Sequence, residues 1–98
     1  MATPGPQPLT FAIGGPIARA DLPRLCARVC ALCENGRAGT VLCDVAGVPP
    51  DAVTVDALAR LQLAARRHGC QVRLRHASPE LLELVAFMGL ADVLPEAG

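Results

Sequence analysis

The sequence predicts a single α/β domain in which a mainly parallel sheet carries its helices mostly on one face. Segments with strand character alternate with segments of helical periodicity along 98 residues, a length that suffices for one hydrophobic core. This alternation implies parallel pairing through right-handed crossovers. Arg73 and Arg75 add a constraint, because a strand between two helix layers would not carry two arginines on one side. We therefore expect the other sheet face to meet water.

The first half of the chain predicts two strands separated by one helix. Leu9–Ile13 places apolar side chains at every second position, which is typical of a strand, and a Gly-Gly-Pro turn follows it. Helical periodicity then runs from about Ala20 to Glu34 and stops at Asn35-Gly36. Thr40–Val45 is almost continuously apolar, which indicates an interior strand.

The middle of the chain adds a second helix and a third strand. Asp51 is a suitable N-cap for a helix over Ala52–Arg67, because its carboxylate can accept hydrogen bonds from the first free amides. Gly69 is expected to end this helix. Gln71–Arg75 alternates apolar and polar residues and predicts the third strand.

The C-terminal part predicts a third helix. It begins at Ser78, has Pro79 at its first position and ends near Gly89. The apolar residues after it indicate a short turn or strand: Leu90, Val93 and Leu94. We expect one domain over residues 9–95, preceded by a flexible lead-in over residues 1–8 that contains three prolines.

Composition argues against several classes of function. The net charge is zero and the nine arginines are mixed with acidic residues, which argues against nucleic acid as the main partner. No apolar run reaches the ~20 residues that a membrane-spanning helix needs. The N-terminus lacks the basic and apolar regions of a secretory signal. Five cysteines without a secretory signal favour a reducing cytoplasm.

Three of the cysteines follow the spacing of one helix face. Cys26, Cys30 and Cys33 lie at i, i+4 and i+7, which favours small apolar side chains in the core. A metal or redox site is the alternative, but the paired CxxC spacing and a nearby histidine are missing. Cys43 and Cys70 are interpreted in the same way.

The segment between the second strand and the second helix carries the most informative pattern. It begins with Asp-Val-Ala-Gly-Val at residues 44–48 and continues through two prolines to Asp51. It resembles the switch loop of STAS domains, the family of bacterial anti-sigma factor antagonists, in which D-hydrophobic-S-G-V is followed by D-S-S/T-G-hydrophobic. Element order over residues 9–95 and the ending at residues 87–95 are also similar to that family. The resemblance implies a mainly parallel four- to five-stranded sheet with three to four helices mostly on one face.

The resemblance also implies a position for phosphorylation. In STAS domains the second hydroxyl residue after the later aspartate is the one that a partner kinase phosphorylates. Aligning Asp51 with that aspartate puts Val53 at this position, and valine has no oxygen that accepts a phosphoryl group. Thr54 is the nearby hydroxyl, but helical periodicity places it on the inward stripe, where it is expected to bond the backbone. A shift of one residue in the alignment would make Thr54 the acceptor, and it stays the alternative candidate.

Helical periodicity sends one strip of the second helix outward: Val53, Asp56, Arg60, Leu63 and Arg67. Its simplest interpretation is a solvated face with an Asp-Arg ion pair at i, i+4. Because two members are apolar and the strip begins at the docking edge that the resemblance implies, an interaction surface is the other interpretation. The candidate partner-binding residues are Asp51, Val53, Thr54, Asp56, Arg60 and Leu63.

Catalytic chemistry has few candidates. His68 ends the second helix and His76 ends the third strand, and neither has a cysteine or serine partner at a catalytic spacing. Asp44 and Asp51 flank one loop, but two carboxylates are too few for a hard-metal site. At the end of its strand, Asp44 is expected to bond loop amides. We therefore expect a non-enzyme without a metal or cofactor.

The resemblance implies a non-catalytic cytoplasmic regulator in signal transduction and transcription regulation. It would act by protein–protein interaction and would lack the phosphorylatable serine. Its partner would be an anti-sigma factor with a serine kinase fold or a larger signalling assembly. Two alternatives stand beside this hypothesis. One is an accessory subunit of a lipid or anion transport system, and the other is a small-molecule sensor with nucleotides as ligands. We expect a monomer or weak dimer that does not insert into a membrane.

Overall fold

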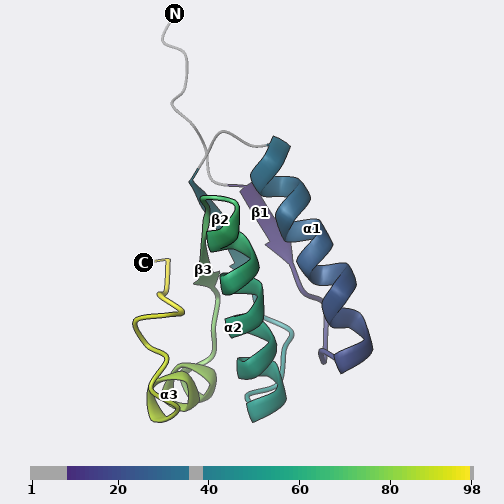
Figure 1. Cartoon of the computed structure of the whole chain (residues 1–98). Helices are drawn as coiled ribbons and strands as arrows, with labels where there is room; N and C mark the ends of the chain where they lie inside the picture. The colour runs from purple at the N-terminus through teal and green to yellow at the C-terminus, as the bar shows by residue number, and fades with distance from the viewer. Residues whose placement is uncertain (1–8, 36–38, 98) are drawn as a thin grey trace, which may run out of the picture.

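In the part of the chain that the structure describes, three parallel strands form one sheet, and two helices lie across one of its faces (Figure 1). The computed structural model describes residues 9–35 and 39–97. In chain order the elements are β1 (Leu9–Ala12), the 3₁₀ turn η1 (Arg19–Asp21), α1 (Leu22–Asn35), β2 (Thr40–Asp44), α2 (Ala52–Arg67), β3 (Gln71–Arg75) and α3 (Pro79–Phe87). The strand order is β1-β2-β3 and both pairings are parallel. The predicted α/β class with a parallel sheet is confirmed.

The described residues contain fewer strands than the expected four to five. Beyond the three strands, the C-terminal segment joins β3 at one bridge between Leu74 and Glu96. Leu74 donates its N–H to the Pro95 carbonyl at 2.9 Å and accepts from the Ala97 N–H at 2.7 Å. The segment after α3 is therefore a turn followed by a single bridge. The predicted lead-in over residues 1–8 lies outside the described residues.

The start of α1 differs slightly from its predicted position. The helix begins at Leu22, later than expected, because the chain first forms η1. Within that turn the Asp21 carboxylate accepts a hydrogen bond from the Ala18 N–H at 3.1 Å. The expected stop residue Gly36 lies outside the described residues.

Among the described residues, α1 and α2 cover one face of the sheet, as the arginine positions predicted (Figure 1). The side chains that point toward the helices are at most 2% exposed: Phe11, Val41, Cys43, Val72 and Leu74. Helix α2 packs over them with a fully buried stripe: Val55, Leu58, Leu61 and Ala65. On the other face of β3, Arg73 is half-buried and Arg75 is exposed.

Gly69 and Gly89 end α2 and α3 in the same way. Their φ angles are 78° and 76°, in the left-handed region that glycine adopts at low cost. In each case the residue after the glycine donates its N–H to a carbonyl in the last turn of the helix at 2.9 Å, as in a Schellman motif. The turn at Gly69 leads the chain into β3, and the turn at Gly89 leads it back toward the edge of β3.

Candidate partner-binding site

Helix α2 begins at the edge where the parallel strands end, and Asp51 fixes its first turn. The Asp51 backbone is extended, with φ −127° and ψ 166°, and its Oδ1 accepts a hydrogen bond from the Thr54 N–H at 2.8 Å. This bond satisfies one of the free amides at the helix start. The predicted N-cap is confirmed, and it determines which residues of the first turn face outward.

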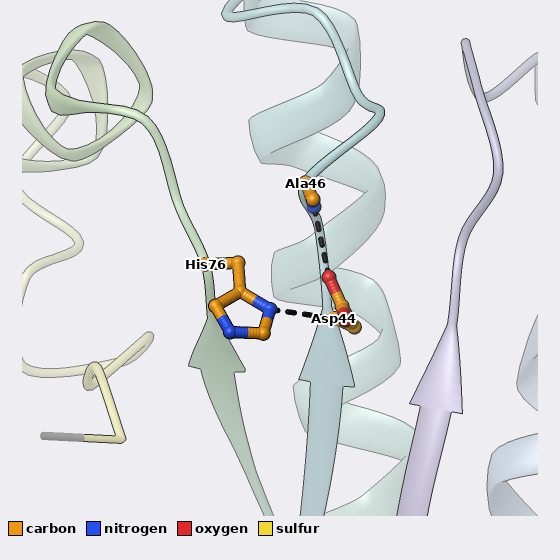
Figure 2. A network of polar contacts seen from close by, with 3 residues as sticks. All are labelled: Asp44, Ala46 and His76. Atoms are coloured by element: carbon orange, nitrogen blue, oxygen red, sulfur yellow. Dashed lines mark hydrogen bonds and ion pairs between the residues drawn. The ribbon is translucent and has the colours of Figure 1, made fainter.

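A second carboxylate connects the loop before α2 to the neighbouring strand. Asp44, the last residue of β2, accepts a hydrogen bond from the Ala46 N–H at 3.0 Å, and its other oxygen lies 3.1 Å from Nδ1 of His76 (Figure 2). His76 follows β3 and has a φ of 59°, which few residues other than glycine adopt. The Ala46 hydrogen bond and then the His76 contact lower the pKa of Asp44. Asp44 therefore bonds a loop amide, as predicted, and also joins the ends of two strands.

In the first turn of α2, Val53 faces solvent and Thr54 faces the interior. Val53 is 48% exposed, whereas Thr54 is 1% exposed. Both orientations agree with the helical periodicity of the sequence. The position that the family resemblance assigns to the phosphoacceptor is thus an aliphatic surface, and the adjacent hydroxyl is inside the protein.

The predicted outward strip of α2 is exposed along its whole length, and we call it the outer strip. Its members are Val53, Asp56, Arg60, Leu63 and Arg67. The Nε of Arg60 lies 2.9 Å from Oδ2 of Asp56, which confirms the predicted ion pair. Both side chains are about 60% exposed, so the pair stabilises the helix by only about 0.3–0.5 kcal/mol.

A hollow of about 360 Å³ lies against the first half of the outer strip. Helix α2 contributes Val53, Asp56 and Arg60, and the opposite wall comes from other parts of the chain: Ile17, Ala18, Arg19, Leu22 and Met88. Sequence reasoning did not identify these residues of the opposite wall. They lie far from α2 in the sequence, so only the packing of η1, α1 and the end of α3 brings them together. The first half of the outer strip is therefore part of a concave, partly apolar surface.

The second half of the outer strip borders another hollow, of about 400 Å³, between α1 and α2. Leu63 and Arg67 line it, together with Cys26 and Cys30 of α1. Both cysteines are half-buried: Cys26 packs against the edge of the core, whereas the prediction of a core position is wrong for Cys30. Burial, and then the neighbouring Cys30 thiol, raise the pKa of Cys26. Cys33, Cys43 and Cys70 are buried, as expected.

The other chemistry-bearing residues are not gathered into one site. Asp51 caps α2 and Asp44 bonds Ala46 and His76, so the two carboxylates of the loop serve different partners. Within residues 9–35 and 39–97, no group of three or more histidine, cysteine or acidic side chains has the arrangement of a metal site. His68 is exposed just after α2 and lines the hollow between α1 and α2.

Comparisons with known proteins identify a family and a similar fold. The family model described as "Mlab, STAS domain" matches residues 4–95. Among solved structures, the anti-sigma factor antagonist SpoIIAA in its unphosphorylated form is similar, with a TM-score of 0.64 and 14% sequence identity. That match covers 91% of this chain and 78% of the SpoIIAA chain. A search of curated proteins found no match. No helix in the described part of the chain is long and apolar enough to cross a bilayer.

Proposed function

The chain belongs to the STAS domain family, and we propose that it is a non-catalytic cytoplasmic regulator that binds a protein partner through the start of α2 and the outer strip. The observation that carries the proposal is the exposure of Val53 on a capped first turn, beside a hollow with apolar and charged walls. Apolar side chains with a charged rim are typical of protein interfaces. Neither the matching family nor the similar fold indicates an enzyme. None of the five cysteines forms a disulfide, which favours a reducing compartment.

The partner class follows from the resemblance to the antagonist fold. We propose an anti-sigma factor of the serine kinase type, which would bind across Asp51, Val53 and Asp56. Thr54 would contribute indirectly, because its N–H holds the cap and its side chain is buried. Without a hydroxyl at the exposed position, binding would not be interrupted by phosphorylation. Control would then come from the partner or from the amount of this protein.

The binding surface can be tested with matched substitutions on two helices. Val53→Asp places a charge on the outer strip, while Ala31→Asp places the same charge on an exposed position of α1 away from the hollows. Tagged wild-type protein and both variants would be purified from native cells, and co-purifying proteins would be measured by quantitative mass spectrometry. We expect one protein to be recovered with the wild type and with Ala31→Asp but lost with Val53→Asp. Equal recovery with all three proteins would exclude this surface.

A second candidate function is that of an accessory subunit of a transport system. The family resemblance also implies this function, and the matching family model is described as "Mlab, STAS domain" and not as an anti-sigma factor antagonist. The same purification separates the two functions. Recovery of an ATPase or permease subunit would support the transport function, and recovery of a serine kinase would support the regulatory one.

A further inference from the structure

The zero net charge of the chain conceals a strong separation of charge along the sequence. Residues 1–75 contain all nine arginines and five carboxylates, whereas residues 76–98 contain four carboxylates and neither arginine nor lysine. The described residues of this second group include α3 and the turn that follows it. The end of the molecule that carries α3 is therefore acidic, while the outer strip of α2 carries more arginine than acid.

Four residues of α3 at i, i+3, i+4 and i+7 share one face of the helix, which we call the α3 face: Glu80, Glu83, Leu84 and Phe87. The buried residues of this helix, Leu81 and Val85, lie on its other side. Together with Pro50, the α3 face lines a hollow of about 410 Å³. This hollow is separate from both hollows along the outer strip, whose lining residues include none of these five.

The exposure of Phe87 is unusual for this chain. It is one of only two aromatic residues in the sequence, and it is 88% exposed, whereas the other, Phe11, is 2% exposed. Single exposed apolar residues are common, whereas contiguous apolar surface rimmed by polar residues is typical of an interaction site. Leu84 lines the same hollow as Phe87 and adds apolar atoms to it.

The carboxylates of the α3 face have no cationic partner in the described chain. Neither the Glu80 nor the Glu83 side chain forms an ion pair or a hydrogen bond with the described residues. The two carboxylates are exposed beside an aromatic ring. An arginine can pair with a carboxylate through its edge and stack on an aromatic ring through its face, so it complements both features.

We propose that the α3 face is a second docking surface and that its occupant is a basic segment of a partner protein. Arginine or lysine side chains of that segment pair with Glu80 and Glu83, and its apolar residues or an arginine plane cover Phe87. This segment is distinct in charge from the partner region that the outer strip accommodates. The two surfaces can therefore be tested separately.

The test uses the full chain and a displayed library of random peptides as the probe. Peptides selected on the wild-type protein are sequenced, and their affinities are measured by fluorescence anisotropy for the wild type and three variants. Phe87→Ser removes the aromatic ring, and Glu80→Gln with Glu83→Gln removes both charges without changing shape. Leu63→Ser is the control, because it removes an exposed apolar side chain of the outer strip. Thermal unfolding confirms that each variant is folded.

We expect the selected peptides to be rich in arginine or lysine next to apolar residues. Phe87→Ser should weaken their binding by about tenfold or more, as removal of an interface anchor does. The double glutamine variant should weaken binding and reduce its salt dependence, while Leu63→Ser should leave it unchanged. Loss of binding in Leu63→Ser alone would favour the outer strip and overturn the α3 proposal.

Three other results would also overturn the proposal. They are failure to select any peptide, selection of acidic peptides, and selected peptides that bind the Phe87→Ser variant as tightly as the wild type. Light scattering tests another occupant of the same face. A dimer that Phe87→Ser converts to a monomer would show that a second copy of this chain covers Phe87.

Discussion

The side-chain carboxamide of Gln62 bonds the backbone of Val72 as a neighbouring strand would. Its Nε2 donates to the Val72 carbonyl at 2.9 Å, and its Oε1 accepts from the Val72 N–H at 2.7 Å. The same Nε2 also donates to the carbonyl of Val93 at 2.7 Å, and Gln62 is fully buried. One side chain therefore joins α2, the outer edge of β3 and the segment after α3. Together with the bridge at Leu74, it covers the edge of β3 that would otherwise be unpaired.

Replacing Gln62 with leucine should therefore destabilise the fold, although leucine has a similar size. The Val72 N–H and carbonyl would both lose their partners, and each buried unpaired group costs about 1–3 kcal/mol. We expect Gln62→Leu to lower the free energy of unfolding by about 2–5 kcal/mol, measured by urea denaturation. Leu63→Gln is the matched control at an exposed position and should change it by less than about 0.5 kcal/mol. A change below about 1 kcal/mol in Gln62→Leu would contradict a structural role for this network.

The five cysteines should differ in reactivity according to their burial. Burial raises the pKa of Cys43 to about 12, and Cys33 and Cys70 are also buried, whereas Cys26 and Cys30 are half-buried beside a hollow. Iodoacetamide at pH 8 should therefore modify Cys30 and, more slowly because its pKa is raised, Cys26 in the folded protein, and all five cysteines in urea. Intact mass and peptide mapping measure the sites. The Cys26→Ala, Cys30→Ala double variant should stay unmodified while folded. Rapid native modification of Cys43 would show that the strand it occupies opens readily.

Sequence periodicity predicted the features of this protein that depend on local geometry. The directions of Val53 and Thr54 and the Asp56–Arg60 pair follow from helical spacing alone, and Asp51 followed from the chemistry of capping. The partner-binding roles of these residues stay predictions, because the orientation of a side chain does not identify a partner.

Features that depend on long-range packing were not predictable in the same way. Gln62 lies on the inward side of α2. Nothing near it in the sequence shows that its side chain bonds the Val72 N–H and carbonyl and the Val93 carbonyl. Met88 and Arg19 meet α2 only through the tertiary fold. Phe87 was also beyond sequence reasoning, because α3 is apolar on most of its circumference and its periodicity does not separate the buried side from the exposed one.

The pKa of Asp44 predicts how stability depends on pH. Because the folded protein lowers this pKa, the charged carboxylate favours the folded state above the ordinary value of about 3.9, and this contribution is lost as pH falls through the lower folded value. The free energy of unfolding would be measured with urea at several pH values below about 4. With decreasing pH it should fall less steeply in Asp44→Asn than in the wild type.

A second substitution separates the two causes of this lowered pKa. His76→Asn removes the ion-pair partner but leaves the Ala46 hydrogen bond, and asparagine tolerates the φ of 59° at this position. The slope of the unfolding free energy against pH in this variant should lie between the slopes of the wild type and of Asp44→Asn. A slope in His76→Asn equal to that of Asp44→Asn would mean that the histidine alone is responsible, contrary to the larger effect of the Ala46 bond.

Placing a hydroxyl at the exposed position of the first turn of α2 should create a phosphorylation site. Val53 is 48% exposed in the first turn, so Val53→Ser presents an oxygen to solvent at little cost in packing. A negative charge added near a helix N-terminus is favoured by the free amides and the helix dipole. Incubation with ATP and a serine kinase of the anti-sigma factor type, followed by intact mass, should show one added phosphate on Val53→Ser and none on the wild type.

Substitution of Thr54 distinguishes the two alignments of the loop, which place either Val53 or Thr54 at the phosphoacceptor position. Thr54 is 1% exposed, so a kinase cannot reach its hydroxyl without opening the first turn of α2. We therefore expect the Val53→Ser, Thr54→Val double variant to be phosphorylated as well as Val53→Ser, and Val53→Ala to stay unmodified. A phosphate on the wild type, or its loss in the double variant, would make Thr54 the acceptor and shift the alignment by one residue. Absence of phosphate on Val53→Ser would contradict the assignment of this position, because exposure and the helix N-terminus would then be insufficient for recognition.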